Sequence, residues 1–348
     1  MQSPAYPPQS TRRPSWMRWL IRLLAGVLLL VAAFFVGPRN HFGPDEAAPR
    51  APVPTDIREL DAWLAAQEAQ VPGIKPGNAK GIVWAAAPGE RTTWSVVYLH
   101  GFSASRLETA PLTEHVARAL GANVFYTRLT GHGLPGEAIG QATVQDWLTD
   151  AQEAIAIGRQ LGDKVLVISC STGATLATWL GTHGLDTGVT GHVFISPNFG
   201  PKDPRADWIN GPWGHRIAYT ILGDERQWTP ASPAEANAWS TRYPTRSLFP
   251  MMALVRGVRE SPLERFTAPV LVLYSPADQT VEPERTKEAF SRFNSTQKDM
   301  VTVDYSDAQG QHVLAGDIKA PKATPVMTNT IIKWAQALAK PALSATKG

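Results

Sequence analysis

Short, largely apolar runs alternate with amphipathic helical stretches after residue 80, and this alternation limits the fold more than any other feature of the chain. A continuous apolar run suits a strand that is buried on both faces of a sheet, and amphipathic helices suit the layers that cover it. Seven runs are predicted as strands, and the first two look like a strand pair: 81–86, 94–99, 123–127, 165–169, 192–196, 270–274 and 301–305. Helices are predicted over 56–68, 111–120, 143–161 and 172–180. The sequence therefore predicts an α/β fold with a mostly parallel central sheet and helices on both faces.

The segment from Asn198 to Phe266 interrupts the alternation, because no strand is apparent in it. It is rich in tryptophan, tyrosine, phenylalanine and methionine. Sheets of this kind place their functional sites outside the carboxyl ends of the strands. We therefore predict that residues 199–266, approximately, form a helical cap insertion over that edge. The alternative is an ordinary helical layer with aromatic side chains in its core.

One long apolar run lies near the start of the chain, from Trp19 to Val36, with Arg22 as its single charge. As a helix rising about 1.5 Å per residue it would span roughly 27 Å, just enough to cross the hydrocarbon core of a membrane. We predict a transmembrane signal anchor over 19–37, after a tail at 1–18 and before a linker at 38–55. The folded domain is predicted over 56–340, with a C-terminal tail at 341–348.

The arginines near this run set its predicted orientation. Four of them precede the run or lie at its start: Arg12, Arg13, Arg18 and Arg22. The positive-inside rule then places the N-terminus in the cytoplasm and the domain outside the cytoplasmic membrane, in the periplasm if the organism is a Gram-negative bacterium. The alternative is a signal peptide whose cleavage releases a secreted protein. The residues 34–38 offer no small-x-small cleavage site, which favours the anchor.

Charge and cysteine content exclude two other classes of protein. The first 50 residues hold six arginines and two acidic residues, a net +4, so the total of +3 leaves −1 for the rest of the chain. A basic nucleic-acid-binding domain is therefore not expected. The chain has one cysteine, Cys170, so it can form no intrachain disulfide.

The pentapeptide Ser169-Cys-Ser-Thr-Gly173 joins a predicted strand to a predicted helix. A strand-to-helix turn of the type small-x-Ser-x-Gly exposes the hydroxyl of its central serine, here Ser171, as a nucleophile. A serine hydroxyl also needs a base, a group that orients the base, and donors for the oxyanion. The Cys170 side chain, between the two serines, is expected to pack rather than react.

An acid and a histidine follow in the chain order expected for a catalytic triad on such a sheet. Asp278 comes just after the strand predicted over 270–274, and His312 lies in a loop before the last helix. Asp304 and Asp307 are rival acids, but they belong to the strand that leads into the histidine loop. The predicted triad is therefore Ser171, Asp278 and His312.

Two backbone N–H groups are predicted to form the oxyanion hole. Phe102 follows His100-Gly101 at the end of the 94–99 strand, and Thr172 follows the nucleophile. Both amides can point to the same space beside the serine. His100 and Gly101 are expected to shape the turn, and Asp146 to cap a helix through a Thr143-x-x-Asp box.

The combined motifs resemble those of the α/β-hydrolases, and of the branch with monoacylglycerol lipases, lysophospholipases and serine aminopeptidases. The resemblance covers about residues 80–340 and rests on His100-Gly-Phe, Gly131-His-Gly, Ser-x-Ser171-x-Gly, Asp278-x-x-Val281 and Gly-x-His312. It implies an α/β-hydrolase fold and hydrolysis of a carboxylic ester through an acyl-enzyme, with no metal or organic cofactor. Ser169 stands where that branch usually has glycine.

The predicted function is a membrane-anchored serine esterase or lipase that acts on small-molecule or lipid-like acyl esters, such as a monoacylglycerol or lysophospholipid. The same triad would serve an acyltransferase, an amidase or a thioesterase. A catalytically silent, anchored binding module is the alternative from a different class, and Ser169 is the residue that supports it.

Overall fold

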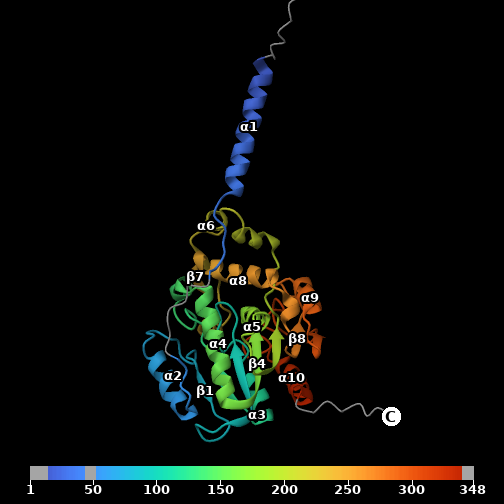
Figure 1. Ribbon diagram of the computed structural model, residues 1–348. Coiled ribbons are helices and arrows are strands. Elements are labelled where there is room, and N and C mark those ends of the chain that lie inside the picture. The colour runs from blue at the N-terminus through green and yellow to red at the C-terminus, as the bar shows by residue number, and fades with distance from the viewer. Residues whose placement is uncertain (1–14, 44–51, 339–348) are drawn as a thin grey trace, which may run out of the picture.

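The computed structural model describes residues 15–43 and 52–338 (Figure 1). The predicted N-terminal tail up to residue 14, the linker residues 44–51 and the chain from residue 339 lie outside the described residues. The domain limits predicted above remain a proposal.

Each of the four predicted helices is present among the described residues. The described helices are α1 Ser15–Phe35, α2 Leu60–Glu68, α3 Leu112–Leu120, α4 Val144–Leu161, α5 Thr172–Thr182, α6 Gly214–Leu222, α7 Pro233–Ala238, α8 Leu248–Glu260, α9 Pro283–Arg292 and α10 Thr324–Leu338. Five short 3-10 helices join them: η1 Ile57–Glu59, η2 Gly136–Gln141, η3 Pro204–Asn210, η4 Thr245–Ser247 and η5 Leu263–Arg265. The predicted capping box is present, because Thr143 and Asp146 each accept the other's backbone N–H at the start of α4.

Within residues 15–43 and 52–338, seven strands form the central sheet in the order β1-β3-β2-β4-β5-β8-β9. β1 runs antiparallel to β3, and every other pair is parallel. The strands are β1 Gly81–Val83, β2 Thr92–Leu99, β3 Asn123–Tyr126, β4 Gly162–Cys170, β5 Val189–Ile195, β8 Val270–Tyr274 and β9 Lys298–Thr302. The mostly parallel sheet is therefore confirmed.

Three details of the predicted strands were wrong. The last strand, predicted over 301–305, begins three residues earlier and ends at Thr302. The first two strands do not pair, because β3 lies between β1 and β2. The connection over 84–91 is long enough to step across one strand, about 10 Å. The segment 198–266 does contain strands, β6 Glu225–Gln227 and β7 Arg242–Pro244, which form a small antiparallel pair. β6 is fully exposed, so it has no apolar run to reveal it.

Side chains of β2 divide the core between the two faces of the sheet, as the two-residue period of a strand requires. Val97 and Leu99 pack in the cluster that contains Trp147 of α4 and Leu176 of α5. Val96 and Tyr98 pack on the other face, in the cluster that contains residues of α3 and α10. Both faces of the sheet are thus covered, as the apolar strands predicted.

Figure 1 shows the helices α6 and α8 above the carboxyl ends of the strands, between the sheet and α1. α1 projects away from the body, and none of its described residues is buried. By length and composition α1 could cross a membrane, and a signal sequence would pass the same test.

Candidate active site

The predicted nucleophile lies in a strained turn between β4 and α5. Ser171 has φ 50° and ψ −115°, a conformation that is rare for a residue with a side chain. Such strain costs about 1–3 kcal/mol and persists only where the surroundings hold it. Here the Ser171 N–H donates to the Ile195 carbonyl at 2.9 Å, so the adjacent strand β5 fixes the turn.

The residues around Ser171 explain the composition of the turn. A Cβ on Gly173 would lie 2.2 Å from the carbonyl oxygen of Leu99, so only glycine allows α5 to approach β2 this closely. Ser169 is a fully buried residue of β4, paired with Leu99 and Phe194. Cys170 is also fully buried, and burial raises the pKa of its thiol well above the usual value. The thiolate is therefore disfavoured, in line with packing of the thiol in the core.

The three residues predicted as a triad are brought together in the predicted order of contacts. His312 Nε2 lies 3.0 Å from Ser171 Oγ, and His312 Nδ1 lies 2.8 Å from Asp278 Oδ2. The other oxygen of Asp278 accepts the N–H groups of Thr280 at 2.7 Å and Val281 at 3.0 Å. The loop after β8 thus orients the carboxylate, which in turn orients the imidazole.

The loop after β2 lies directly beside the nucleophile. A Cβ on Gly101 would be 3.2 Å from Ser171 Cβ, so the chain at Gly101-Phe102 passes against the serine. Thr172 is the first residue of α5, and the first N–H groups of a helix have no partner within it. The chain at both predicted oxyanion donors therefore lies close to Ser171, and their role as donors stays a prediction.

His100 shapes this loop. Its Nε2 accepts the Leu129 N–H at 3.0 Å, and its Nδ1 lies 2.9 Å from the Gly101 carbonyl oxygen. Burial lowers the pKa of His100 to about 4, so the ring is neutral at physiological pH. A neutral ring with Nδ1–H donating to Gly101 and Nε2 accepting from Leu129 satisfies both contacts.

A comparison with models of protein families shows the family to which this chain belongs. Residues 96–315, more than half of the chain, match the model of the "Alpha/beta hydrolase family". The chain belongs to this family.

Individual relatives of this alpha/beta hydrolase are distant. A "Thermostable monoacylglycerol lipase" of Bacillus sp. (strain H-257) is 28% identical over 206 residues, which are 59% of this chain and 79% of the relative. A solved structure described under "LipS and LipT, two metagenome-derived lipolytic enzymes" aligns with a TM-score of 0.60 and 20% identity, over 76% of this chain and 99% of the other. A monoglyceride lipase from Saccharomyces cerevisiae aligns with a TM-score of 0.59 and 15% identity, over 84% and 100%. The protein is thus a hydrolase of the esterase and lipase kind.

The hydrolase has one buried acid near the site that sequence reasoning missed. Glu108 is 2% exposed, and its Oε1 accepts the Gly101 N–H at 2.7 Å and the Tyr98 hydroxyl at 3.0 Å. Burial raises the pKa of Glu108 to about 7, although these two hydrogen bonds favour its charged form. The residue stands in a loop without a motif, so no sequence signal identified it.

An apolar cavity of about 560 Å³ lies within the cap of the hydrolase. Its lining includes Trp208, Ile217 and Met251 from the cap and Thr280 from the loop after Asp278. Tyr243 also lines it, and the Tyr243 ring meets the Phe102 ring edge-on at 5.4 Å. The cavity therefore adjoins both the acid loop and the proposed oxyanion loop. A cavity of this size and composition suits an apolar ligand.

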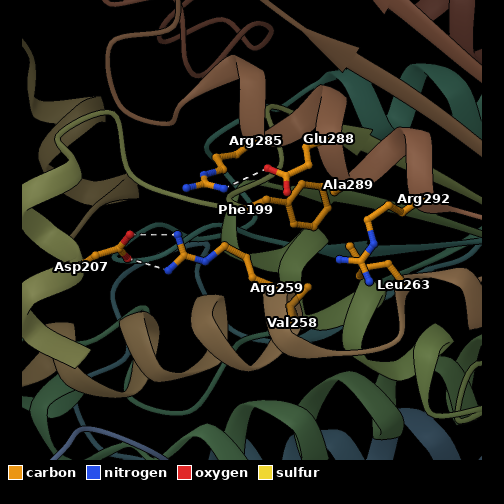
Figure 2. A pocket seen from close by; sticks show the side chains of 9 residues that line it. All are labelled: Phe199, Asp207, Val258, Arg259, Leu263, Arg285, Glu288, Ala289 and Arg292. Carbon is orange, nitrogen blue, oxygen red and sulfur yellow. Dashed lines mark hydrogen bonds and ion pairs between the residues drawn. The ribbon is translucent and has the colours of Figure 1, made fainter. Parts of the chain in front are cut away.

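Figure 2 shows a second, smaller pocket of about 250 Å³ between η3, α8 and α9. Neither this pocket nor the apolar cavity is lined by a triad residue. Arginines are prominent in it, but each is paired with a carboxylate. Arg259 bonds to Asp207 at 2.6 and 3.0 Å, and Arg285 bonds to Glu288 at 2.9 Å (Figure 2). Arg292 bonds to Glu264 at 2.8 Å. The guanidinium charges are balanced, so the pocket has no excess charge for an anionic ligand.

Proposed function

We propose that this alpha/beta hydrolase is a serine ester hydrolase that cleaves lipid-like acyl esters, such as a monoacylglycerol or a lysophospholipid. The observation that carries the proposal is the continuous hydrogen-bond chain from Asp278 through His312 to the Ser171 hydroxyl. The adjoining apolar cavity supports an acyl substrate, as does the distant similarity to a monoacylglycerol lipase.

The reaction begins when His312 Nε2 takes the proton of Ser171 Oγ as that oxygen attacks the ester carbonyl carbon. The backbone N–H groups of Phe102 and Thr172 stabilise the oxyanion of the tetrahedral intermediate. Asp278 holds the ring and stabilises the imidazolium, which then protonates the leaving alcohol. Water, activated by His312, attacks the acyl-enzyme and releases the carboxylic acid and Ser171.

α1 is proposed to be an uncleaved signal anchor, with the domain outside the cytoplasmic membrane. The absence of a small-x-small site over 34–38 supports the anchor. The mass of the mature protein, recovered from both the membrane and the soluble fractions, distinguishes the anchor from a cleaved signal peptide. A chain that retains α1 is expected, and a chain that begins after residue 36 would show a cleaved signal peptide.

Replacement of the nucleophile tests the function. The full chain in detergent should hydrolyse p-nitrophenyl acyl esters and react with a fluorophosphonate, and Ser171→Ala should lose both, with turnover lowered at least about a thousandfold. Ser169→Ala is the matched control, because it removes a neighbouring hydroxyl that forms no hydrogen bond with a triad residue. Full turnover by Ser171→Ala would reject the proposal.

A further inference from the structure

The chain passes from α1 into the cap with almost no slack. α1 ends at Phe35, and three residues later the carbonyl of Pro38 accepts the backbone N–H of Trp213 at 2.8 Å. Gly37 lies against the Trp213 indole, where a Cβ would come within 2.1 Å of Nε1. The cap therefore begins two residues beyond the apolar helix.

Asn40 then fixes this segment to three elements of the cap. Its Nδ2 donates to Asn210 Oδ1 at 2.9 Å and to the Phe249 carbonyl at 2.8 Å, and its Oδ1 lies 3.0 Å from His215 Nε2. Asn40 is 6% exposed. These partners belong to η3, α8 and α6, so the first part of the predicted linker is a built part of the cap.

This connection limits the distance between the cap and any membrane that α1 spans. Three residues, from Phe35 to Pro38, reach at most about 10 Å when fully extended. The headgroup layer on each side of the hydrocarbon core is roughly 5–8 Å thick. The part of the cap around Trp213 must then lie in or at that layer.

The cap surface next to Trp213 has the composition of a membrane interface. α6 begins directly after Trp213 and leaves Tyr219 38% and Ile221 62% exposed, and Trp208 of η3 is 54% exposed. The Arg216 guanidinium lies over the Trp213 ring, 5.2 Å from its centroid. Tyrosine and tryptophan are enriched at the level of the headgroups, where they combine an apolar ring with a polar group.

The same elements line the apolar cavity described above. Trp208 and Ile221 are both exposed residues of the cap surface and lining residues of the cavity. An opening at these side chains would face the headgroup layer. The lining also reaches Thr280, whose N–H donates to the triad acid.

We propose that the surface formed by Trp208, Trp213 and α6 rests in the outer headgroup layer of the membrane that α1 spans, so that lipid esters enter the cavity from the bilayer. This inference rests on the proposed function and on the proposed anchor. The fixed Asn40 segment makes the contact a consequence of anchoring, because the cap cannot swing away on a free linker.

Depth measurement on the full chain tests the contact. Cys170 is the only cysteine and is fully buried, so a cysteine introduced at an exposed position is the one accessible thiol. A nitroxide label attached to the cysteine of Thr220→Cys would lie on the exposed face of α6, outside the cavity lining. Leu185→Cys is the matched control, because Leu185 is exposed and lies between α5 and β5, at the amino ends of the parallel strands and away from the cap.

In phosphatidylcholine nanodiscs, the label at residue 220 should be protected from a water-soluble nickel chelate and relaxed by lipid-soluble oxygen. The label at residue 185 should show the opposite. Equal exposure of both labels to the chelate would overturn the proposal. This readout needs no catalysis, so it is independent of whether the protein hydrolyses esters.

A kinetic comparison separates substrate delivery from chemistry. Tyr219→Asp places a charge on α6 without altering a cavity-lining or triad residue. It should lower hydrolysis of a monoacylglycerol in vesicles several-fold and leave p-nitrophenyl butyrate turnover unchanged, and Val326→Asp on α10 should change neither. Equal rates of Tyr219→Asp and the parent on vesicles would overturn lateral delivery. If Ser171→Ala keeps full activity, the proposed function itself is rejected.

Discussion

The carboxylate of Glu108 accepts the N–H of Gly101 at 2.7 Å, and Gly101 precedes the proposed oxyanion donor Phe102. The same oxygen accepts the Tyr98 hydroxyl, so Glu108 joins the end of β2 to the loop that follows it. A Cβ on Gly101 would touch both Glu108 and Ser171, at 3.1 and 3.2 Å. Glu108 therefore supports the backbone beside the nucleophile from within the core.

Replacement of Glu108 separates its shape from its charge. Glu108→Ala removes the acceptor of a buried N–H and a buried hydroxyl, so the loop should lose its position and kcat should fall on the order of 100-fold. Glu108→Gln keeps an acceptor oxygen, and its kcat should stay within about threefold of the parent. The measurement is p-nitrophenyl butyrate turnover on variants with a cooperative thermal transition. Equal losses in both variants would show that the charge matters more than the acceptor.

The raised pKa of Glu108 predicts a pH-dependent stability. Between pH 4.5 and about 7 the folded protein holds a proton that the unfolded chain has released. The stability contributed by this proton is fully present below pH 4.5 and is lost as the pH rises through about 7. The shift from 4.5 to about 7 corresponds to ~3 kcal/mol. Glu108→Gln carries no such penalty.

Thermal unfolding of both proteins at pH 5 and pH 8 checks this prediction. The melting temperature of Glu108→Gln, relative to that of the parent, should be higher at pH 8 than at pH 5. A difference that is the same at both pH values would contradict it.

Most of the fold could be predicted from periodicity, because a parallel sheet covered on both faces produces continuous apolar strands such as 165–169 and 270–274. The contacts of Ser171, Asp278 and His312 agree with the geometry expected from their places at strand ends. β1 was assigned to the wrong neighbour. The connection over 84–91 lets β3 lie between β1 and β2, and the apolar pattern does not show which strand takes that place. β6 escaped detection because an exposed three-residue strand has no hydrophobic pattern.

Glu108 and Asn40 could not be found in the sequence for a different reason. Each acts through partners far along the chain or in an irregular loop, and single polar residues outside motifs give no signal. The linker predicted at 38–55 has the composition of a flexible segment, but the fit of Gly37 against Trp213 and the burial of Asn40 depend on the cap surface.

Ser169, which stands where the resembling branch usually has glycine, should have little effect on activity and should cost the fold a small amount of stability. The Ser169 hydroxyl is buried and has no hydrogen-bond partner among the described residues. Ser169→Ala should therefore stabilise the protein by about 1 kcal/mol. Ser169→Gly gains the same but loses about as much to backbone entropy in a strand, so its melting temperature should match the parent's. Both variants should keep kcat within about twofold, and a large gain in kcat with Ser169→Gly would show that the hydroxymethyl group distorts the turn.

Gly173, the glycine of the turn, should tolerate no side chain. A Cβ on Gly173 would lie 2.2 Å from the Leu99 carbonyl oxygen and 2.9 Å from that of His100, and backbone atoms cannot yield as a flexible side chain can. Gly173→Ala should push α5 away from β2, destabilise the fold by about 2 kcal/mol and lower kcat on the order of 100-fold by displacing the Thr172 N–H. Gly81→Ala is the control, because a Cβ there meets nothing within 4 Å. Melting temperatures and p-nitrophenyl butyrate turnover of the two variants, measured side by side, check the prediction. Parent-like kcat in Gly173→Ala would remove Thr172 from the oxyanion hole.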